Sequence, residues 1–388
     1  MPEKTMLYAS VGPQLTHYDL DVDDASLRRR ATAILPANVH YAWPHASREL
    51  LYVASSNSAS GVGGVVGDKH HVSAFRIDPA TGALAPHGAP IPLPTRPIHM
   101  TSDIPSRNLL VAFSNPSGLR VYRINPDGTP GAEVAQREAI DPGIYGHQVR
   151  VSLDDRLAIL VTRGHDAAAG KPEEPGALKV FCYHDGMLSG EVSVAPGGGY
   201  GFGPRHLDFH PSKPWVYVSL ERQNRLDTFA LDGGRLSAAP LFSTNTLAEP
   251  GNIRGRQVAG TTHVHPNGRF VYVANRASST VGEGAQRVFA GGENTLAVFE
   301  VDPATGEPNP IQHVDTRGIH CRTFHIDPSG RLLVAAHIIG LPVRENGAVR
   351  KLPACLSLFR IGADGRLDFV RKYDVEVGGQ QMFWMGMV

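Results

Sequence analysis

The sequence predicts an all-β protein, a seven-bladed β-propeller whose last blade is closed by strands from both ends of the chain. One alternating apolar pattern with an aromatic at a fixed place occurs seven times. Turn-forming residues follow most copies, and no segment shows the sustained 3.6-residue apolar period of a helix. We therefore expect one propeller domain over residues 1–388.

The seven copies include HHVSAFRID, GLRVYRIN and TLAVFEVD. Sequences such as DPATG, NPDG and GADG follow most of them, and their Pro, Asp and Gly residues supply the backbone angles that a tight hairpin requires. Each copy is therefore expected to be the third strand of a blade. The aromatics at the shared position are Tyr18, Phe75, Tyr122, Phe181, Phe229, Phe299 and Phe359.

The first two strands of a blade are predicted from paired elements such as RHLDFHPSKPWVYVSLE, in which two alternating runs flank a turn. The shortest spacing between copies is the 47 residues from Phe75 to Tyr122, which accommodates four short strands. The N-terminal MLYASVG and LTHYDLD lack a first strand, and the C-terminal MFWMGMV lacks a second. Pairing of residues 6–11 with 382–387 would close the ring and leave no free edge.

The composition of the chain excludes some classes of binding partner. The 37 basic and 37 acidic residues are interspersed, so the chain has no basic stripe for nucleic acid and no polybasic segment for a membrane surface. No apolar run approaches the roughly 20 residues that span a bilayer, and MPEKTMLYAS lacks the features of a signal peptide. Three scattered cysteines fit a reducing compartment. We expect a cytoplasmic protein with a small-molecule partner, whose oligomeric state the sequence does not indicate.

The predicted blades bring charged residues to one mouth of the central channel. In an up-and-down blade, the start of the first strand and the end of the second lie on the same face. Insertions at 57–70, 164–176, 277–293 and 338–354 all follow second strands and fall on that face. As residues of a solvated rim, the charged side chains there are expected to contribute little to stability. They are His40, His147, Arg205, His206 and Arg322 at first strands, and Arg163, Glu221 and Arg276 at the ends of second strands.

The sequence resembles the seven-bladed lactonase family that includes bacterial 6-phosphogluconolactonase and fungal carboxymuconate cyclase. The most specific similarities are YGHQVRVSLDDR, GPRHLDFHPSKPWVYVSLE and HVHPNGRFVYVANR, in that order and spacing. The resemblance extends over nearly the whole chain and implies an active site formed by His147, Arg205, Glu221 and Arg276. The four insertions depart from the family pattern and would reshape the mouth, so the substrate stays open.

A cluster of arginines and histidines around one carboxylate suits an anionic lactone. Arg205 and Arg276 can bind the anionic group through planar guanidinium forks, and either Glu221 or His147 can act as the base for water. A lactone-forming cycloisomerase would use the same anion site with a proton donor, and a non-catalytic scaffold would bind a peptide on this face. His40, Arg163, His206 and Arg322 are predicted to bind substrate.

No cofactor or metal is expected. GHDAAAGKP does not have the glycine spacing of a phosphate-binding loop. His263 and His265 alternate on one strand and invite a metal hypothesis. His265, however, occupies the turn position also held by His45 and His210, which the repeat explains structurally.

Overall fold

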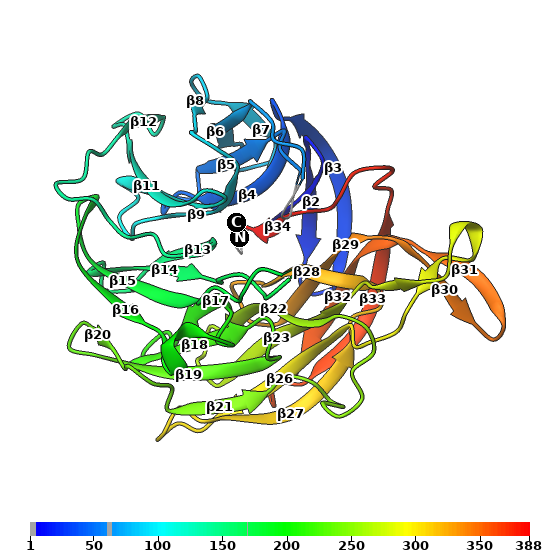
Figure 1. Ribbon diagram of the computed structural model, residues 1–388. Helices are drawn as coiled ribbons and strands as arrows, with labels where there is room; N and C mark the ends of the chain where they lie inside the picture. The colour runs from blue at the N-terminus through cyan, green and yellow to red at the C-terminus, as the bar shows by residue number, and fades with distance from the viewer. Residues whose placement is uncertain (1–4, 60–63, 169) are drawn as a thin grey trace.

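The computed structural model describes residues 5–59, 64–168 and 170–388, and it confirms the seven-bladed propeller. Seven antiparallel sheets surround a central channel, and the first strand of each sheet is the one nearest the channel (Figure 1). The aromatic of every repeat lies on the third strand from the channel, as predicted.

Three blades follow one another in the first half of the chain. From the channel outward, the first contains β4 (Asn38–Pro44), β5 (Leu50–Ser56) and β6 (His70–Ile77), with β7 (Leu84–Pro86) and β8 (Ile91–Pro92) both paired to β6. The second contains β9 (Pro97–Ser102), β10 (Asn108–Ser114), β11 (Ser117–Ile124) and β12 (Pro130–Glu133). The third contains β13 (Gly146–Val151), β14 (Leu157–Thr162), β15 (Ala177–His184) and β16 (Met187–Val194).

Three more blades form the second half. The first contains β17 (Pro204–Phe209), β18 (Trp215–Leu220) and β19 (Arg225–Asp232), with β20 (Arg235–Leu236) and β21 (Phe242–Asn245) both paired to β19. The next contains β22 (Gln257–Val264), β23 (Phe270–Ala277), β26 (Thr295–Val301) and β27 (Pro308–Asp315). The last of these contains β28 (Ile319–Ile326), β29 (Leu332–Ile339), β32 (Ala354–Ile361) and β33 (Leu367–Val375).

The seventh blade joins the two ends of the chain, which confirms the predicted closure. Its strands, from the channel outward, are β34 (Met385–Met387), β1 (Met6–Val11), β2 (Gln14–Asp21) and β3 (Ser26–Ile34). β1 and β34 are antiparallel, with Leu7 opposite Met387 and Ala9 opposite Met385. Because both termini complete one sheet, the ring has no unpaired inner edge at this point.

The core lies between neighbouring blades, where apolar faces of adjacent sheets pack together. One cluster, for example, joins Leu110 of β10 and Leu119 of β11 to Val149 of β13 and Phe181 of β15. The third-strand aromatics Phe181, Phe229, Phe299 and Phe359 are fully buried in these layers. Burial of large side chains between all seven sheets is the main term that holds the blades together.

A repeated hydrogen bond also links one blade to the next. A buried tyrosine on a second strand donates its hydroxyl to the carbonyl of a glycine in the adjoining blade's outer hairpin turn, at 2.8 to 3.0 Å. These glycines end the DPATG, NPDG and GADG turns and have φ between +71° and +85°, a region that disfavours a side chain. The pairs are Tyr8–Gly82, Tyr52–Gly128, Tyr217–Gly306 and Tyr272–Gly365.

Two of the predicted insertions, 277–293 and 338–354, form small elements on the side of the ring where second strands end, while residues 60–63 and 169 of the other two lie outside the described residues. β24 (Thr280–Val281) pairs with β25 (Val288–Phe289), and β30 (Leu341–Glu345) pairs with β31 (Ala348–Leu352) in a hairpin that projects beyond the ring (Figure 1). A short 3₁₀ turn, η2 (Gly284–Gln286), lies between β24 and β25, and another, η1 (Pro196–Gly199), precedes β17. Within the described ranges, no helix is long and apolar enough to cross a membrane.

Replacing Tyr272 by Phe should lower the free energy of unfolding by about 1–2 kcal/mol, because the Gly365 carbonyl loses its buried donor. Urea denaturation followed by tryptophan fluorescence measures the change. Tyr200→Phe is the matched control, since Tyr200 is 60% exposed and should be neutral. Equal stability of Tyr272→Phe and the wild type would show that these inter-blade hydrogen bonds do not stabilise the ring.

Candidate active site

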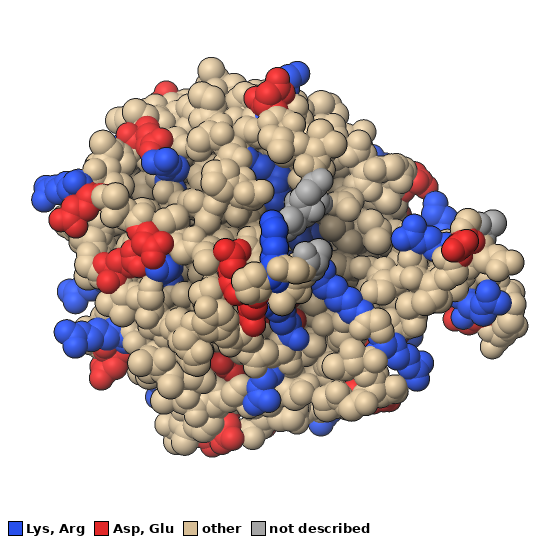
Figure 2. All heavy atoms as spheres, viewed as in Figure 1, with Lys and Arg blue, Asp and Glu red and all other residues tan. Residues whose placement is uncertain are grey.

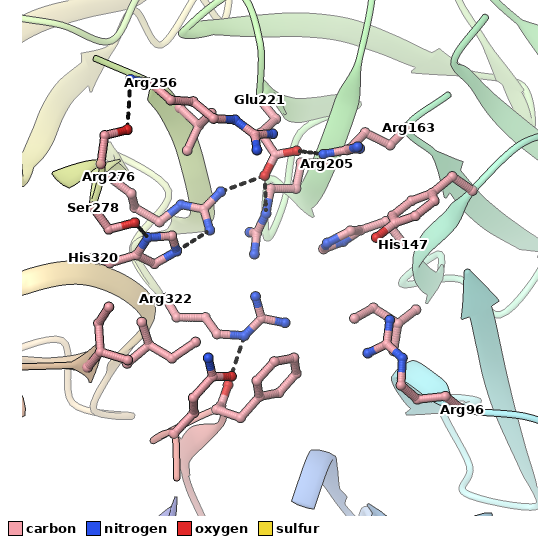
Figure 3. Close-up of a pocket in the computed structure, with 18 residues that line it drawn as sticks. Arg96, His147, Arg163, Arg205, Glu221, Arg256, Arg276, Ser278, His320 and Arg322 are labelled. Atoms are coloured by element: carbon pink, nitrogen blue, oxygen red, sulfur yellow. Dashed lines mark hydrogen bonds and ion pairs between the residues drawn. The ribbon is translucent and has the colours of Figure 1, made fainter. Parts of the chain in front are cut away.

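A pocket of about 330 Å³ opens where the first strands begin and the second strands end. Six of the eight sequence-predicted site residues line it: His147, Arg163, Arg205, Glu221, Arg276 and Arg322. Figure 3 shows the guanidinium groups of Arg205, Arg276 and Arg322 pointing into one space, with His147 on its opposite side. The alignment of the predicted blades therefore placed in one site residues as far apart in the sequence as His147 and Arg322, which are 175 positions apart.

A β-bulge on the innermost strand directs each of these first-strand side chains. In β17, Pro204 pairs with Leu220 and His206 with Ser219, which leaves Arg205 as the extra residue. His147 of β13 and Arg322 of β28 are extra residues in the same way. A bulge bends its strand and re-aims one side chain, so a repeated bulge produces a ring of side chains at one depth of the channel.

A second ring lies two residues upstream of the bulges, because alternate residues of a strand share a face. It contributes Arg96, Tyr145, Val258 and His320 to the pocket. Tyr145 and His320 have left-handed backbones, with φ of 59° and 58°, where the equivalent residue before β17 is a glycine, Gly203. Non-glycine residues in this region cost of order 1 kcal/mol or more, and such strain is concentrated at functional sites.

Glu221 is the centre of the electrostatic network. One carboxylate oxygen lies 2.7 Å from Nη2 of Arg276 and 3.3 Å from Nε of Arg205, and the other accepts a 2.6 Å hydrogen bond from Nη1 of Arg163. Burial raises the pKa of Glu221, but Arg276, Arg163 and Arg205 outweigh that effect and hold the pKa well below its usual range. Glu221 is therefore ionised, and both its oxygens are already occupied.

Arg276 is fixed by two further contacts. Its Nη2 donates to the Ala259 carbonyl at 2.8 Å, and its Nη1 donates to Nε2 of His320 at 3.1 Å. Because a guanidinium can only donate, Nε2 accepts and Nδ1–H of His320 donates to Oγ of Ser278 at 3.0 Å. Burial, then Arg276, holds the pKa of His320 well below its usual range, which agrees with a neutral ring.

His147 is also neutral. Burial and then Arg205 hold its pKa well below the usual value, despite the opposing effect of Glu221. Its Nδ1 is buried and has no hydrogen-bond partner among the described residues. Nε2 is therefore the nitrogen that a pocket ligand can use. A neutral imidazole beside several guanidinium groups can accept a proton, and an incoming anion would make it a stronger base.

The pocket carries a surplus of positive charge. Six arginines and one carboxylate, that of Glu221, line it among the residues that the structure describes. Figure 2 shows basic side chains bordering the hollow at the centre of the ring. Since the whole chain is electrically balanced, this local excess is a property of the site.

Two predicted substrate-binding residues do not reach the pocket surface. His40 lies behind Arg96, whose Nη1 is 3.3 Å from the His40 Nδ1, and against the ring of Phe383. His206 follows the bulge residue Arg205, so its side chain faces a deeper cavity in the channel. Both predictions assumed that every polar residue at a strand start faces the mouth.

The expectation of a solvated rim is also wrong. Arg205 is 1% exposed, Arg276 is 2% exposed and Glu221 is 7% exposed. Arg205 is turned inward by its bulge, and Glu221 and Arg276, at the ends of second strands, are buried against it. Substitutions there will therefore change stability as well as activity.

Sequence reasoning missed Arg96, Tyr145, Arg256, Ser278 and His320. The strand period of two, counted back from the bulge positions, would have found Arg96, Tyr145 and His320. Arg256 and Ser278 depend on loop conformation and carried no comparable signal.

No group of three or more His, Cys, Asp or Glu side chains in the described ranges could hold a metal ion. His265 is 2.8 Å from the Gly330 carbonyl through Nε2, and His210 makes the same contact, at 3.0 Å, with Gly268. These turn histidines join neighbouring blades, in agreement with a structural role.

Comparisons with known proteins agree with the fold. A family model described as "Lactonase, 7-bladed beta-propeller" matches residues 7–338. The chain is 27% identical over 351 residues to 6-phosphogluconolactonase from Bacillus subtilis, covering 88% of this chain and 90% of that protein. It is 29% identical over 269 residues to 6-phosphogluconolactonase from Cronobacter sakazakii, covering 68% and 70% respectively.

Among solved structures, the periplasmic gluconolactonase PpgL from Pseudomonas aeruginosa superimposes with a TM-score of 0.73. The two chains share 22% identity, and the superposition covers 99% of each. This similarity shows a common fold.

Glu221→Gln should lower the free energy of unfolding at neutral pH by about 3–5 kcal/mol, because three buried arginines lose their shared counter-charge. The folded-state pKa of Glu221 lies below its unfolded value of about 4.5, so this stabilisation is complete above pH 4.5 and declines as the pH falls towards the folded pKa. Denaturation of both proteins from pH 7 to pH 3 measures it. A stability difference that is independent of pH would contradict an ionised Glu221.

Proposed function

The chain belongs to the seven-bladed β-propeller lactonase family, and we propose that it hydrolyses an anionic, sugar-derived lactone in the pocket around Glu221. The observation that carries this proposal is a neutral imidazole, His147, facing a surplus of guanidinium groups. Hydrolysis of a lactone needs a base for water and positive groups for the oxyanion that develops on the carbonyl. The curated relatives named above are 6-phosphogluconolactonases, which supports this class of substrate.

The contacts favour His147 over Glu221 as the base. Both oxygens of Glu221 are held by arginines, whereas the His147 ring makes no hydrogen bond within the described residues. Glu221 instead positions the arginines. Arg205 has Nη2 unengaged within the described chain and points into the pocket, where it suits a developing oxyanion (Figure 3).

In the proposed reaction, Nε2 of His147 removes a proton from water while the water oxygen bonds to the lactone carbonyl carbon. The carbonyl oxygen becomes negatively charged and is stabilised by Arg205. The ring C–O bond then breaks, and the leaving oxygen takes the proton from the imidazolium. The product is an open-chain hydroxy acid, and the step needs no metal and no cofactor.

The alternatives receive less support. A lactone-forming cycloisomerase needs a proton donor in the resting site, and His147 is neutral there, so it has no imidazolium proton to give. A scaffold for peptides would leave the buried cationic network without a purpose. We further propose that the protein is cytoplasmic, since all three cysteines are free thiols.

A pH-stat screen of phosphorylated, acidic and neutral lactones, run beside a muconate absorbance assay, tests the function. We expect enzyme-dependent acid release that is fastest with anionic lactones, and no loss of muconate. Loss of muconate without acid release would identify a cycloisomerase, and no reaction with any lactone would contradict the proposal.

His147→Asn should lower kcat by about 10²–10⁴ with little change in KM, because the variant removes the base and keeps a polar side chain of similar reach. Initial rates of acid release measure the effect, after subtraction of the spontaneous rate. His184→Asn, an exposed histidine at the end of β15, is the matched control. Full turnover by His147→Asn would exclude His147 as the base.

The pH profile of kcat/KM reports groups of the free enzyme, so it should show the depressed pKa of His147. Activity requires the neutral ring, so it should stay constant as the pH falls from 7 through 6.5 and decline only at lower pH, whereas an unperturbed histidine would give a limb centred near pH 6.5. An acidic limb centred at pH 6.5 or above would contradict the electrostatic account.

A further inference from the structure

We infer that Arg96 and Arg322 form a separate anion subsite within this pocket, suited to a doubly charged oxyanion such as the phosphate group of a phosphorylated lactone. This inference rests on the proposed function and specifies the substrate class. We call the two residues the Arg96–Arg322 subsite. It is distinct from Arg205 and Arg276, which contact Glu221 and which the sequence predicted to bind the anionic group of the substrate.

The two groups of arginines differ in their counter-charges. Arg163, Arg205 and Arg276 share the carboxylate of Glu221. Arg96 and Arg322 pair with no carboxylate anywhere in the described ranges, although both line the pocket. A buried cation normally has an anionic partner. An anion from solution can supply it here.

Neutral groups hold Arg96 in place. Its Nη2 donates to Oγ of Ser114 at 3.2 Å, and its Nη1 donates to Nδ1 of His40 at 3.3 Å. Burial, then Arg96 itself, holds the pKa of His40 well below the usual range, so the ring is neutral and can accept. His40 thus acts on the site through Arg96, as a positioning residue.

Arg322 is fixed from the other side. Its Nε donates to the Phe383 carbonyl at 3.0 Å, and its guanidinium carbon lies 3.6 Å from the centre of the Phe383 ring. The edge of His40 packs on the same ring, with centroids 4.8 Å apart. His40 and Phe383 therefore connect the two arginines, and the Nη groups of Arg322 face the pocket without a partner in the described chain (Figure 3).

The arrangement carries an electrostatic cost that an anion would relieve. Burial, then Arg276 and Arg96, lowers the pKa of Arg322 to about 9, so the guanidinium stays charged at neutral pH while repelled by its neighbours. A dianion can neutralise both arginines of the subsite, and its several oxygens can accept hydrogen bonds from both guanidinium groups. A single carboxylate carries one charge and pairs with only one guanidinium group. A phosphate held here leaves Arg205 and His147 for the lactone carbonyl.

Binding of inorganic phosphate, measured by isothermal titration calorimetry at low ionic strength, tests the subsite without any reaction. Arg96→Met and Arg322→Met should each weaken phosphate binding by about 10- to 100-fold, the scale of a lost charge-assisted contact. Arg235→Met, at an exposed arginine of β20, should leave it unchanged. Arg96→Lys keeps the charge and should give an intermediate affinity, which decides the matter if Arg96→Met does not fold.

Kinetics provide the second arm, with the same lactone supplied with and without its phosphate. Arg96→Met should lose at least about ten-fold more kcat/KM on the phosphorylated than on the unphosphorylated compound. Equal losses on both, or unchanged phosphate binding, would overturn the inference while hydrolysis stands. If no lactone is hydrolysed, the proposed function fails, and the calorimetry still decides whether the subsite binds phosphate.

Discussion

The site depends on one buried carboxylate. Glu221 holds Arg163, Arg205 and Arg276 within ion-pair distance of its two oxygens, at the mouth of the channel, where Glu221, Arg205 and Arg276 are buried. Without it, three adjacent guanidinium groups would repel each other in a region of low dielectric. With it, they keep fixed positions and a net positive charge. Burial and that residual charge together depress the pKa of His147, and the charge prepares the pocket for an anion.

The propeller supplies the geometry that makes this possible. Each first strand enters the channel at the mouth, and in β13, β17 and β28 a bulge there turns an extra side chain inward. Side chains from five different blades can then converge, because rings of equivalent positions lie at one depth. The inter-blade packing and the tyrosine–glycine hydrogen bonds keep those positions constant. The site is therefore built mainly on the sheets, and the loops that follow second strands add Ser278 and shape the entrance.

The sequence predicted the blades, their closure and six pocket-lining residues, because repeated strands and turns carry strong local signals. It did not predict the depth of the side chains. Arg205 was expected on a solvated rim and is almost fully buried, since a bulge cannot be seen in a pattern of alternating residues. Nor did it show that Glu221 forms ion pairs with Arg205 and Arg276. Arg96 and Arg322 are thereby left without a carboxylate partner in the described ranges. Such a division depends on distances, and these come only from the folded chain.

The account's central claim is that surplus positive charge controls the site and that an anion relieves it. The direct measurement is the titration of His147 by NMR of ¹⁵N-histidine-labelled protein, assigned with His147→Asn, in the absence and presence of saturating inorganic phosphate. The account predicts a pKa below 6.5 in the free protein and a clear increase when phosphate binds. A pKa at or above 6.5 that phosphate does not change would contradict it.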